Sequence, residues 1–203
     1  MAACARTWGV LKWLRAAGCV TLLLMAAISL PAQDDAELPL GAARSEYEIK
    51  SAILYNFTKF VQWPGRALGE TGVPAVVGVL GDDGLVPVLE ASLRNKTVYG
   101  HPIVVRRLYS SAGAKSCAVL FVGVSDRSEI FRIVRSVGAS PVLTIGQCVQ
   151  FTRLGGVSAL IREGGRYQFQ INREAAERAG LKVSSKLLRL ATVVRADPER
   201  ARN

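Results

Sequence analysis

The chain has 203 residues and a formal net charge of +10. This length suits one globular domain once an N-terminal export segment is set aside. The charge is uneven, because residues 153–203 contain 11 Lys and Arg against 5 Asp and Glu, whereas residues 33–152 contain 12 against 11. Basic and aromatic residues do not interleave in the way that stacks nucleic-acid bases. The basic C-terminal segment therefore suits an acidic protein, an anionic surface or a solvated helix face, and we expect no nucleic acid.

Residues 1–32 are predicted to be a secretory signal peptide. Basic residues precede an apolar run at residues 16–30, and small residues at its end allow cleavage after Ser29 or Ala32. The run is shorter than the roughly 20 residues that span a bilayer comfortably. Cleavage is therefore favoured over an uncleaved signal anchor, and we expect no stable membrane insertion of the mature chain.

A flexible leader and a long amphipathic helix follow. Residues 33–43 are predicted to be the leader. The helix is predicted from Ser45 or Glu46 to about Gln62, because apolar residues recur at helical spacing and Ser45 can cap the first turn. The sequence Trp63-Pro64-Gly65 is predicted to end it.

Four apolar runs alternate with helical segments in the middle of the chain. They lack the polar alternation of half-exposed strands, which indicates strands buried on both faces of a mainly parallel sheet. The connection between the second and third runs is too short for a helix, so we expect an excursion or an edge position there. The strands are residues 73–80, 102–108, 117–122 and 141–145, and the helices are residues 85–94, 125–137 and 149–154.

The segment from Gly155 to Leu190 predicts a hairpin followed by two helices. Gly164-Gly165 lies between two alternating segments, which is typical of a two-residue hairpin turn. Asn172 can cap a helix that Gly180 ends. Ser184 or Ser185 can cap a last helix that runs to Val194.

The predicted fold class is therefore α/β. It combines a mainly parallel sheet, flanked by helices on both faces, with a C-terminal β-hairpin and two terminal helices. The single domain is expected over residues 44–196, and residues 197–203 form a tail.

Several residues suggest chemistry but have simpler explanations. Gly78, Gly81 and Gly84 follow a strand, but their spacing is not the dinucleotide fingerprint, and Asp82 and Asp83 would repel a phosphate. These two carboxylates suit a turn and a helix cap, and further metal ligands do not lie nearby in the sequence.

Two other candidates are equally weak. His101 is the one histidine, and it has no partner at a catalytic or zinc-binding spacing. Ser184 or Ser185 with Lys186 could form a Ser/Lys dyad, but a helix cap and a solvated lysine explain the same residues. We therefore predict no catalytic, cofactor or metal site.

The mature chain keeps two cysteines, Cys117 and Cys148. Parallel strands would place them near opposite ends of the sheet, separated by roughly the 17 Å length of a strand. A disulfide needs a Cα separation of about 4.4–6.8 Å, so both thiols are expected to be free.

Six segments cover most of the mature chain and occur in a characteristic order. They are EYEIKSAILYNFTKFVQWP (46–64), VVGVLGDD (76–83), GHPIVVRRL (100–108), CAVLFVG (117–123), PVLTIG (141–146) and residues 155–190. Together they resemble the YfiR family of exported α/β proteins. The family's best-understood member binds the periplasmic sensor region of an inner-membrane diguanylate cyclase and holds that enzyme inactive. That member is stabilised by disulfides, and the present chain departs from it at its cysteines.

The resemblance implies a periplasmic regulatory binding protein that represses a membrane signalling enzyme in cyclic di-GMP and biofilm control. Candidate partner-binding residues are Lys186, Arg189 and Arg195, which accompany the apolar positions of the last helix. Apolar surface left exposed there could also pair two copies of the chain.

Two alternatives remain open. The first is a periplasmic small-ligand-binding protein that uses the crevice near Gly81–Gly84 and Gly123–Asp126. The second is a hydrolase that uses Ser184 or Ser185.

We predict that the exported protein begins at Leu30 or Gln33. The short apolar run should be removed by signal peptidase rather than anchor the chain. N-terminal sequencing of the protein from a periplasmic extract measures this directly. Recovery of intact Met1 in the membrane pellet would instead identify a tethered domain.

Overall fold

Helix α1 (Leu38–Phe60) begins seven residues earlier than predicted. The computed structural model describes residues 38–65 and 67–195, with the backbone alone for residues 38–44. Ser45 therefore lies inside the helix and is not its cap, and Pro39 falls in the first turn, where a missing N–H costs no hydrogen bond. The predicted signal peptide, residues 33–37 of the leader and the tail lie outside the described residues.

The chain forms a mixed sheet of eight strands in the order β10-β8-β7-β6-β5-β2-β4-β3. Strands β4, β2, β5, β6 and β7 are parallel neighbours, whereas β8 pairs antiparallel with β7 and β3 with β4. This arrangement confirms the predicted α/β fold. The strands are β2 (Ala75–Leu80), β3 (Thr97–Val98), β4 (His101–Leu108), β5 (Val119–Val122), β6 (Leu143–Gly146), β7 (Ser158–Glu163), β8 (Arg166–Asn172) and β10 (Thr192–Val194).

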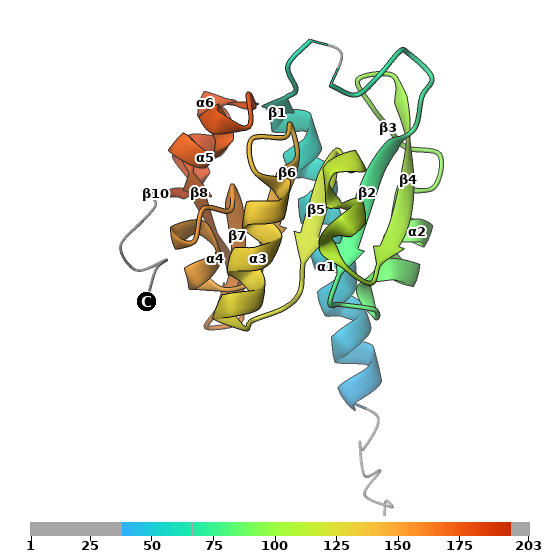
Figure 1. The fold of residues 1–203 in the computed structure, drawn as a ribbon. Coiled ribbons are helices and arrows are strands. Elements are labelled where there is room, and N and C mark those ends of the chain that lie inside the picture. Colours follow the sequence, from blue (N-terminus) through green and yellow to red (C-terminus); the bar gives the residue numbers. More distant parts are fainter. Residues whose placement is uncertain (1–37, 66, 196–203) are drawn as a thin grey trace, which may run out of the picture. The chain divides into compact units, whose positions relative to one another are not determined.

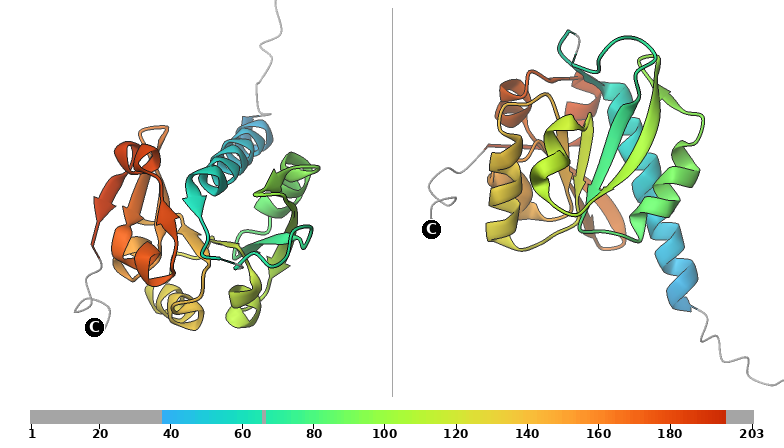
Figure 2. Two further views of the ribbon diagram at one scale, coloured as in Figure 1. Left: turned by 90° about the horizontal axis from the view of Figure 1, so that it is seen from above. Right: turned by 45° about the vertical axis from the view of Figure 1, so that its right-hand side comes forward.

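Helices cover both faces of this sheet (Figures 1 and 2). One face carries α1, α2 (Leu85–Leu93), α5 (Arg173–Arg178) and α6 (Ser185–Leu190). The other carries η1 (Ser111–Ser116), α3 (Arg127–Val137) and α4 (Val149–Arg153). Side chains along a buried strand alternate between the two faces of the sheet. In β5, Val119 and Phe121 pack under α1, while Leu120 and Val122 pack under α3 and α4.

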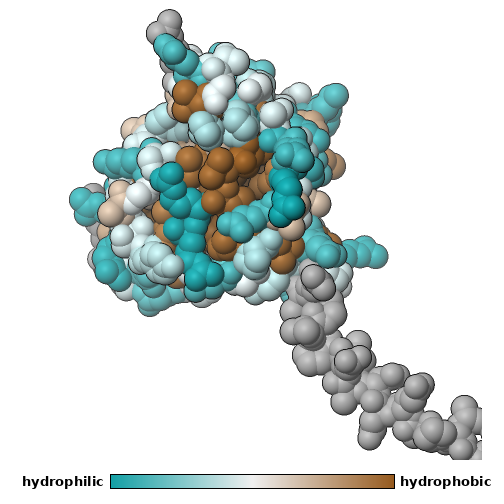
Figure 3. All heavy atoms as spheres, turned by 90° about the vertical axis from the view of Figure 1, so that its right-hand side faces the viewer, coloured by the Kyte–Doolittle hydropathy of each residue, from teal (hydrophilic) through white to brown (hydrophobic). Residues whose placement is uncertain are grey.

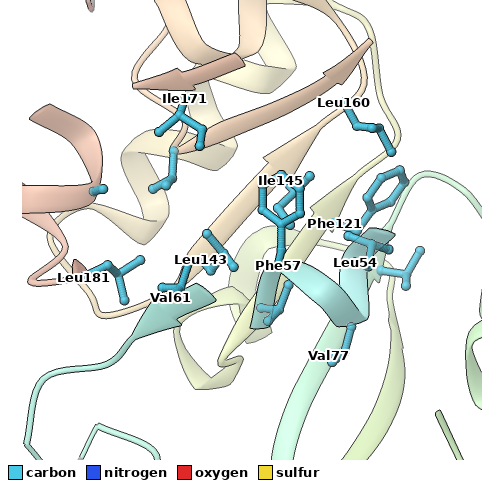
Figure 4. Close-up of a cluster of buried hydrophobic side chains, with 14 of the residues drawn as sticks. Leu54, Phe57, Val61, Val77, Phe121, Leu143, Ile145, Leu160, Ile171 and Leu181 are labelled. Carbon is cyan, nitrogen blue, oxygen red and sulfur yellow. The ribbon is translucent and has the colours of Figure 1, made fainter. Parts of the chain in front are cut away.

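The larger core lies between α1 and the sheet (Figure 4). Leu54 and Phe57 of α1 are 2% and 3% exposed, and they face side chains from five different strands. The labelled strand residues of this core include Val77, Phe121, Leu143, Ile145, Leu160 and Ile171. The chain continues from α1 into β1 (Val61–Gln62), which pairs with β9 (Lys182–Val183) in a separate two-stranded sheet.

The short connection between β4 and β5 takes the form of a 3₁₀ helix, η1. It crosses β2, because β4 and β5 lie on opposite sides of that strand. Strand β4 is second from the edge, so the predicted edge position applies to it only in part. The remaining boundaries of the four predicted strands and three predicted helices differ from the structure by up to two residues.

The hairpin and both terminal helices are present, but the last helix is shorter than predicted. Asn172 caps α5 through its side-chain oxygen, which accepts from Ala175 N at 2.9 Å. The last helix ends at Leu190, because the β-branched run Thr192–Val194 pairs as β10 beside β8. Helix α3 begins two residues later than predicted, because Asp126 caps it and its carboxylate accepts from Glu129 N at 2.8 Å.

Among residues 38–65 and 67–195, no helix has the length and apolar character needed to cross a bilayer.

We predict that Gly156→Ala destabilises the protein by about 1–3 kcal/mol, because the new methyl group would overlap the buried ring of Phe151. Urea unfolding measures the change. Gly113→Ala is the matched control, since its Cβ would lie 3.2 Å from one flexible Leu108 methyl group. Adding Phe151→Leu should recover part of the loss in the Gly156→Ala background, and a purely additive double mutant would contradict the overlap.

Candidate functional site

The carboxyl ends of β2 and β5 form the topological switch point of the sheet, which is the usual ligand crevice of α/β proteins. Gly81 and Gly123 follow these two strands, and their backbones are in close contact. A Cβ at Gly123 would lie 2.7 Å from the Gly81 carbonyl oxygen, so only glycine fits there. The crevice is therefore narrow at its base.

Lys50 of α1 fills the space above these glycines. The residue is 7% exposed, and its Nζ lies 3.0 Å from Glu46 Oε1 and 3.8 Å from Asp82 Oδ2. Lys50 Nζ also donates to Gln147 Oε1 at 3.2 Å, and Gln147 Nε2 donates to the Gly123 carbonyl at 2.7 Å. One lysine thus joins α1 to the residues that follow β2, β5 and β6.

Charged and phenolic groups extend this network. The hydrogen bond from Lys50 lowers the pKa of Glu46, and Arg162 Nη1 adds a second contact to Glu46 at 3.1 Å. The charge of Asp82 raises the pKa of Tyr47, and burial together with Glu46 raises the pKa of Tyr167 to about 12. Both phenols therefore stay protonated at neutral pH. The buried Tyr167 hydroxyl lacks a partner in hydrogen-bond geometry among the described residues.

The charges of this network balance. Two carboxylates, Glu46 and Asp82, face two cations, Lys50 and Arg162. The crevice to which sequence analysis assigned a possible small ligand is thus filled by the protein's own side chains. Sequence reasoning missed Lys50, although a lysine four residues before Leu54 lies on the buried face of an amphipathic helix.

The other sequence candidates occupy structural positions. Ser184 Oγ accepts from Leu187 N at 3.3 Å as the cap of α6, and Lys186 is exposed. His101 is 7% exposed, with Nδ1 2.9 Å from the Val73 carbonyl oxygen. Asp83 forms an exposed ion pair with Arg107 at 3.4 Å. In the part of the chain that the structure describes, no group of three or more His, Cys, Asp or Glu side chains is arranged to hold a metal.

The two cysteines lie at opposite ends of neighbouring strands. Cys117 precedes the amino end of β5, and Cys148 follows the carboxyl end of β6, which is parallel to β5. Burial raises the pKa of the Cys117 thiol, so this thiol is a weak nucleophile. Both thiols are free in this structure, and their state in the exported protein stays a prediction.

The exposed residues of α6 and β10 form what we call the C-terminal surface. Leu190 is 72% exposed and Val193 is 52% exposed, so apolar side chains of both α6 and β10 reach the solvent. The three basic candidates Lys186, Arg189 and Arg195 are all exposed beside them, and Arg195 Nε lies 3.9 Å from Glu174 Oε1. Between α5 and α6 lies a cavity of about 280 Å³. Apolar groups within a basic surround suit an acidic protein partner.

A second apolar area lies on the side of the sheet that carries α2 and β4. Figure 3 shows apolar residues in a hollow on this side, bordered by hydrophilic ones. Val104 in β4 is 43% exposed. Lys59 and Lys96 lie over the ring of Tyr55, with Nζ 4.2 and 4.6 Å from its centroid. This side is therefore also apolar and basic.

A sequence model of the YfiR/HmsC-like family matches residues 47–192. The chain belongs to this family. The matched range begins one residue after Glu46 and ends in β10, so it contains Lys50, Asp82, Gln147 and Arg162 of the network and helix α6 of the C-terminal surface.

Two solved structures are similar to this YfiR/HmsC-like chain. A conserved domain protein from Vibrio cholerae O1 biovar El Tor is 16% identical, with a TM-score of 0.49, and the match covers 72% of this chain and 59% of that one. The ABC domain in complex with L-Trp from Streptococcus pneumoniae is 13% identical, with a TM-score of 0.46 and coverages of 59% and 55%. The chain thus spans less than two thirds of either structure.

We predict that Lys50→Met destabilises the protein by about 2–4 kcal/mol at pH 7, because Glu46 and Asp82 lose their shared cation. Lys59→Met on the same helix is the control, since Lys59 is exposed and contacts only the Tyr55 ring in the interactions described above. Urea unfolding compares the two variants with the wild type.

The same comparison should depend on pH. The folded-state pKa of Glu46 lies below its usual value of 4.5, so its contribution is complete above pH 4.5 and is lost as pH falls through the lowered value. The gap between wild type and Lys50→Met should therefore narrow at pH 3. An unchanged gap would mean that Lys50 acts through packing and not through charge.

Proposed function

We propose that this protein is an exported regulator that binds the periplasmic part of an inner-membrane diguanylate cyclase and lowers its output. The observation that carries the proposal is the family match over residues 47–192. The YfiR/HmsC-like family is known for regulating diguanylate cyclases from the periplasm. The partner of this particular chain is part of the proposal.

The filled crevice supports binding over catalysis. A regulator needs a stable scaffold and an accessible surface, and it does not need an open pocket at the strand ends. The Lys50 network closes the position where a related fold would hold a substrate. The hydroxyl of Ser184, the first residue of the alternative Ser/Lys dyad, is engaged as a helix cap.

The C-terminal surface is the docking site that we favour. Its exposed leucine and valine provide apolar area that a partner can cover. Its basic side chains should accelerate encounter with an acidic patch, whereas apolar contact should set the lifetime of the complex. Association should consequently slow as salt concentration rises, with a smaller effect on dissociation.

Periplasmic location is the remaining part of the proposal. It rests on the predicted signal peptide at residues 1–32 and on the periplasmic location of the family. A periplasmic regulator reaches only the outer domain of its partner, so its signal must cross the membrane through the cyclase itself.

We predict that deletion of the gene raises cellular cyclic di-GMP, and that expression of the exported protein lowers it again. Unchanged cyclic di-GMP after deletion would overturn the cyclase proposal. Complementation with surface variants then maps the docking site in the same assay.

The double variant Lys186→Glu with Arg189→Glu and the single variant Leu190→Ser should each complement poorly. Both change exposed side chains of α6, so the fold should persist. Arg132→Glu is the control, because it reverses an exposed charge on α3, which packs on the other face of the sheet. Full complementation by both C-terminal variants would show that the docking site is not on the C-terminal surface.

A further inference from the structure

A cavity of about 310 Å³ lies between the C-terminal end of α3, helix α5 and the loop at residues 154–157. It also reaches Val142 and Thr144, which are at the amino end of β6. The filled crevice lies at the opposite, carboxyl end of the same strands, so the two sites share no residues. This cavity belongs to neither the Lys50 network nor the C-terminal surface.

The floor of this cavity is apolar with one hydroxyl group. Thr144 is 4% exposed, and its Oγ1 accepts a hydrogen bond from Val157 N at 2.9 Å. The hydroxyl hydrogen remains available as a donor. The apolar residues, each at most 7% exposed, are Val137, Val142, Leu154, Val157, Ala175 and Ala179.

Two arginines stand at the rim. Arg135 is in the last turn of α3 and Arg178 in the last turn of α5, and both are exposed. Within residues 38–65 and 67–195, no carboxylate oxygen lies within 4.0 Å of either guanidinium. The acids of α5 are engaged elsewhere, since Glu177 pairs with Arg173 and Glu174 lies 3.9 Å from Arg195.

Both arginines also lie where they can offset the negative end of a helix. A long helix carries the equivalent of about half a negative charge at its C-terminus, so two ends compensate at most about one of the two positive charges. Helix α5 has six residues, and its contribution is smaller still. The rim therefore keeps a net positive charge above an apolar floor.

We propose that this cavity binds a small organic carboxylate with an apolar body. The planar guanidinium groups suit a carboxylate, and the floor suits a hydrocarbon chain or ring. A cavity of about 150 Å³ accepts benzene, so 310 Å³ has room for about ten non-hydrogen atoms. This binding would not depend on the cyclase partner. It would place a small ligand in the α3–α5 cavity and not in the crevice at the carboxyl ends of β2 and β5.

The test uses the mature protein labelled with ¹⁵N and titrated with 3-phenylpropionate and, separately, with octanoate. At about 0.3 kcal/mol per ligand atom, binding should occur at low millimolar concentration, which amide chemical shifts can detect. The largest shifts should map to Gly138, Gly155, Val157 and Ala179. The uncharged analogue 3-phenylpropan-1-ol and the cationic 3-phenylpropylamine should each bind at least fivefold more weakly than 3-phenylpropionate.

Two variants separate charge recognition from non-specific partitioning. Arg135→Gln with Arg178→Gln should raise the Kd for 3-phenylpropionate at least fivefold, while Arg132→Gln on the same helix α3 should leave it unchanged. Dispersed amide spectra confirm that each variant is folded. The proposal is overturned if neither carboxylate shifts these amides at 20 mM (about three to five times the Kd of roughly 4–6 mM that 0.3 kcal/mol per atom gives), if the alcohol binds equally well, or if the double variant binds like wild type.

Discussion

The attachment of α1 to the sheet is the constraint on which the rest of this structure depends. Its apolar face covers strands β2, β5 and β6, and Lys50 contacts Asp82 after β2 and Gln147 after β6, which in turn donates to Gly123 after β5. Apolar burial supplies most of the free energy of this contact, because side chains such as Leu54 and Phe57 are almost fully removed from water. The Lys50 network fixes the position of α1 along the sheet, because the lysine can contact Glu46, Asp82 and Gln147 together only when the helix lies in one place.

This attachment also explains why the fold does not offer the usual α/β binding site. In doubly wound proteins the crevice at the switch point stays open because neighbouring loops diverge there. Here the glycine contact between Gly81 and Gly123 brings the two loops together, and α1 covers them. Functional surfaces are therefore expected where α1 does not reach, at the C-terminal surface and at the α3–α5 cavity.

In residues 155–194, local sequence signals determine the turn and the helix caps, whereas long-range strand pairing determines where the last helix ends. Gly164 and Gly165, with φ of 56° and 78°, form the hairpin turn that their sequence predicts. Asn172 and Ser184 cap the helices that follow. Yet the last three residues of the predicted final helix form a strand, because Thr192–Val194 find a parallel partner in β8. That partner is about twenty residues away in the sequence, and local propensity cannot identify it.

The sequence by itself determined the α/β class, the buried strands, the hairpin and the helix caps, since each depends on the period of apolar residues or on one turn. It also carried the family resemblance that underlies the proposed function. Only the tertiary structure decided that Lys50 fills the crevice, that β1 and β9 pair, and that Arg135 and Arg178 border the same cavity. These features join residues 32 to 122 positions apart in the sequence, and their geometry exists only after the helices dock on the sheet.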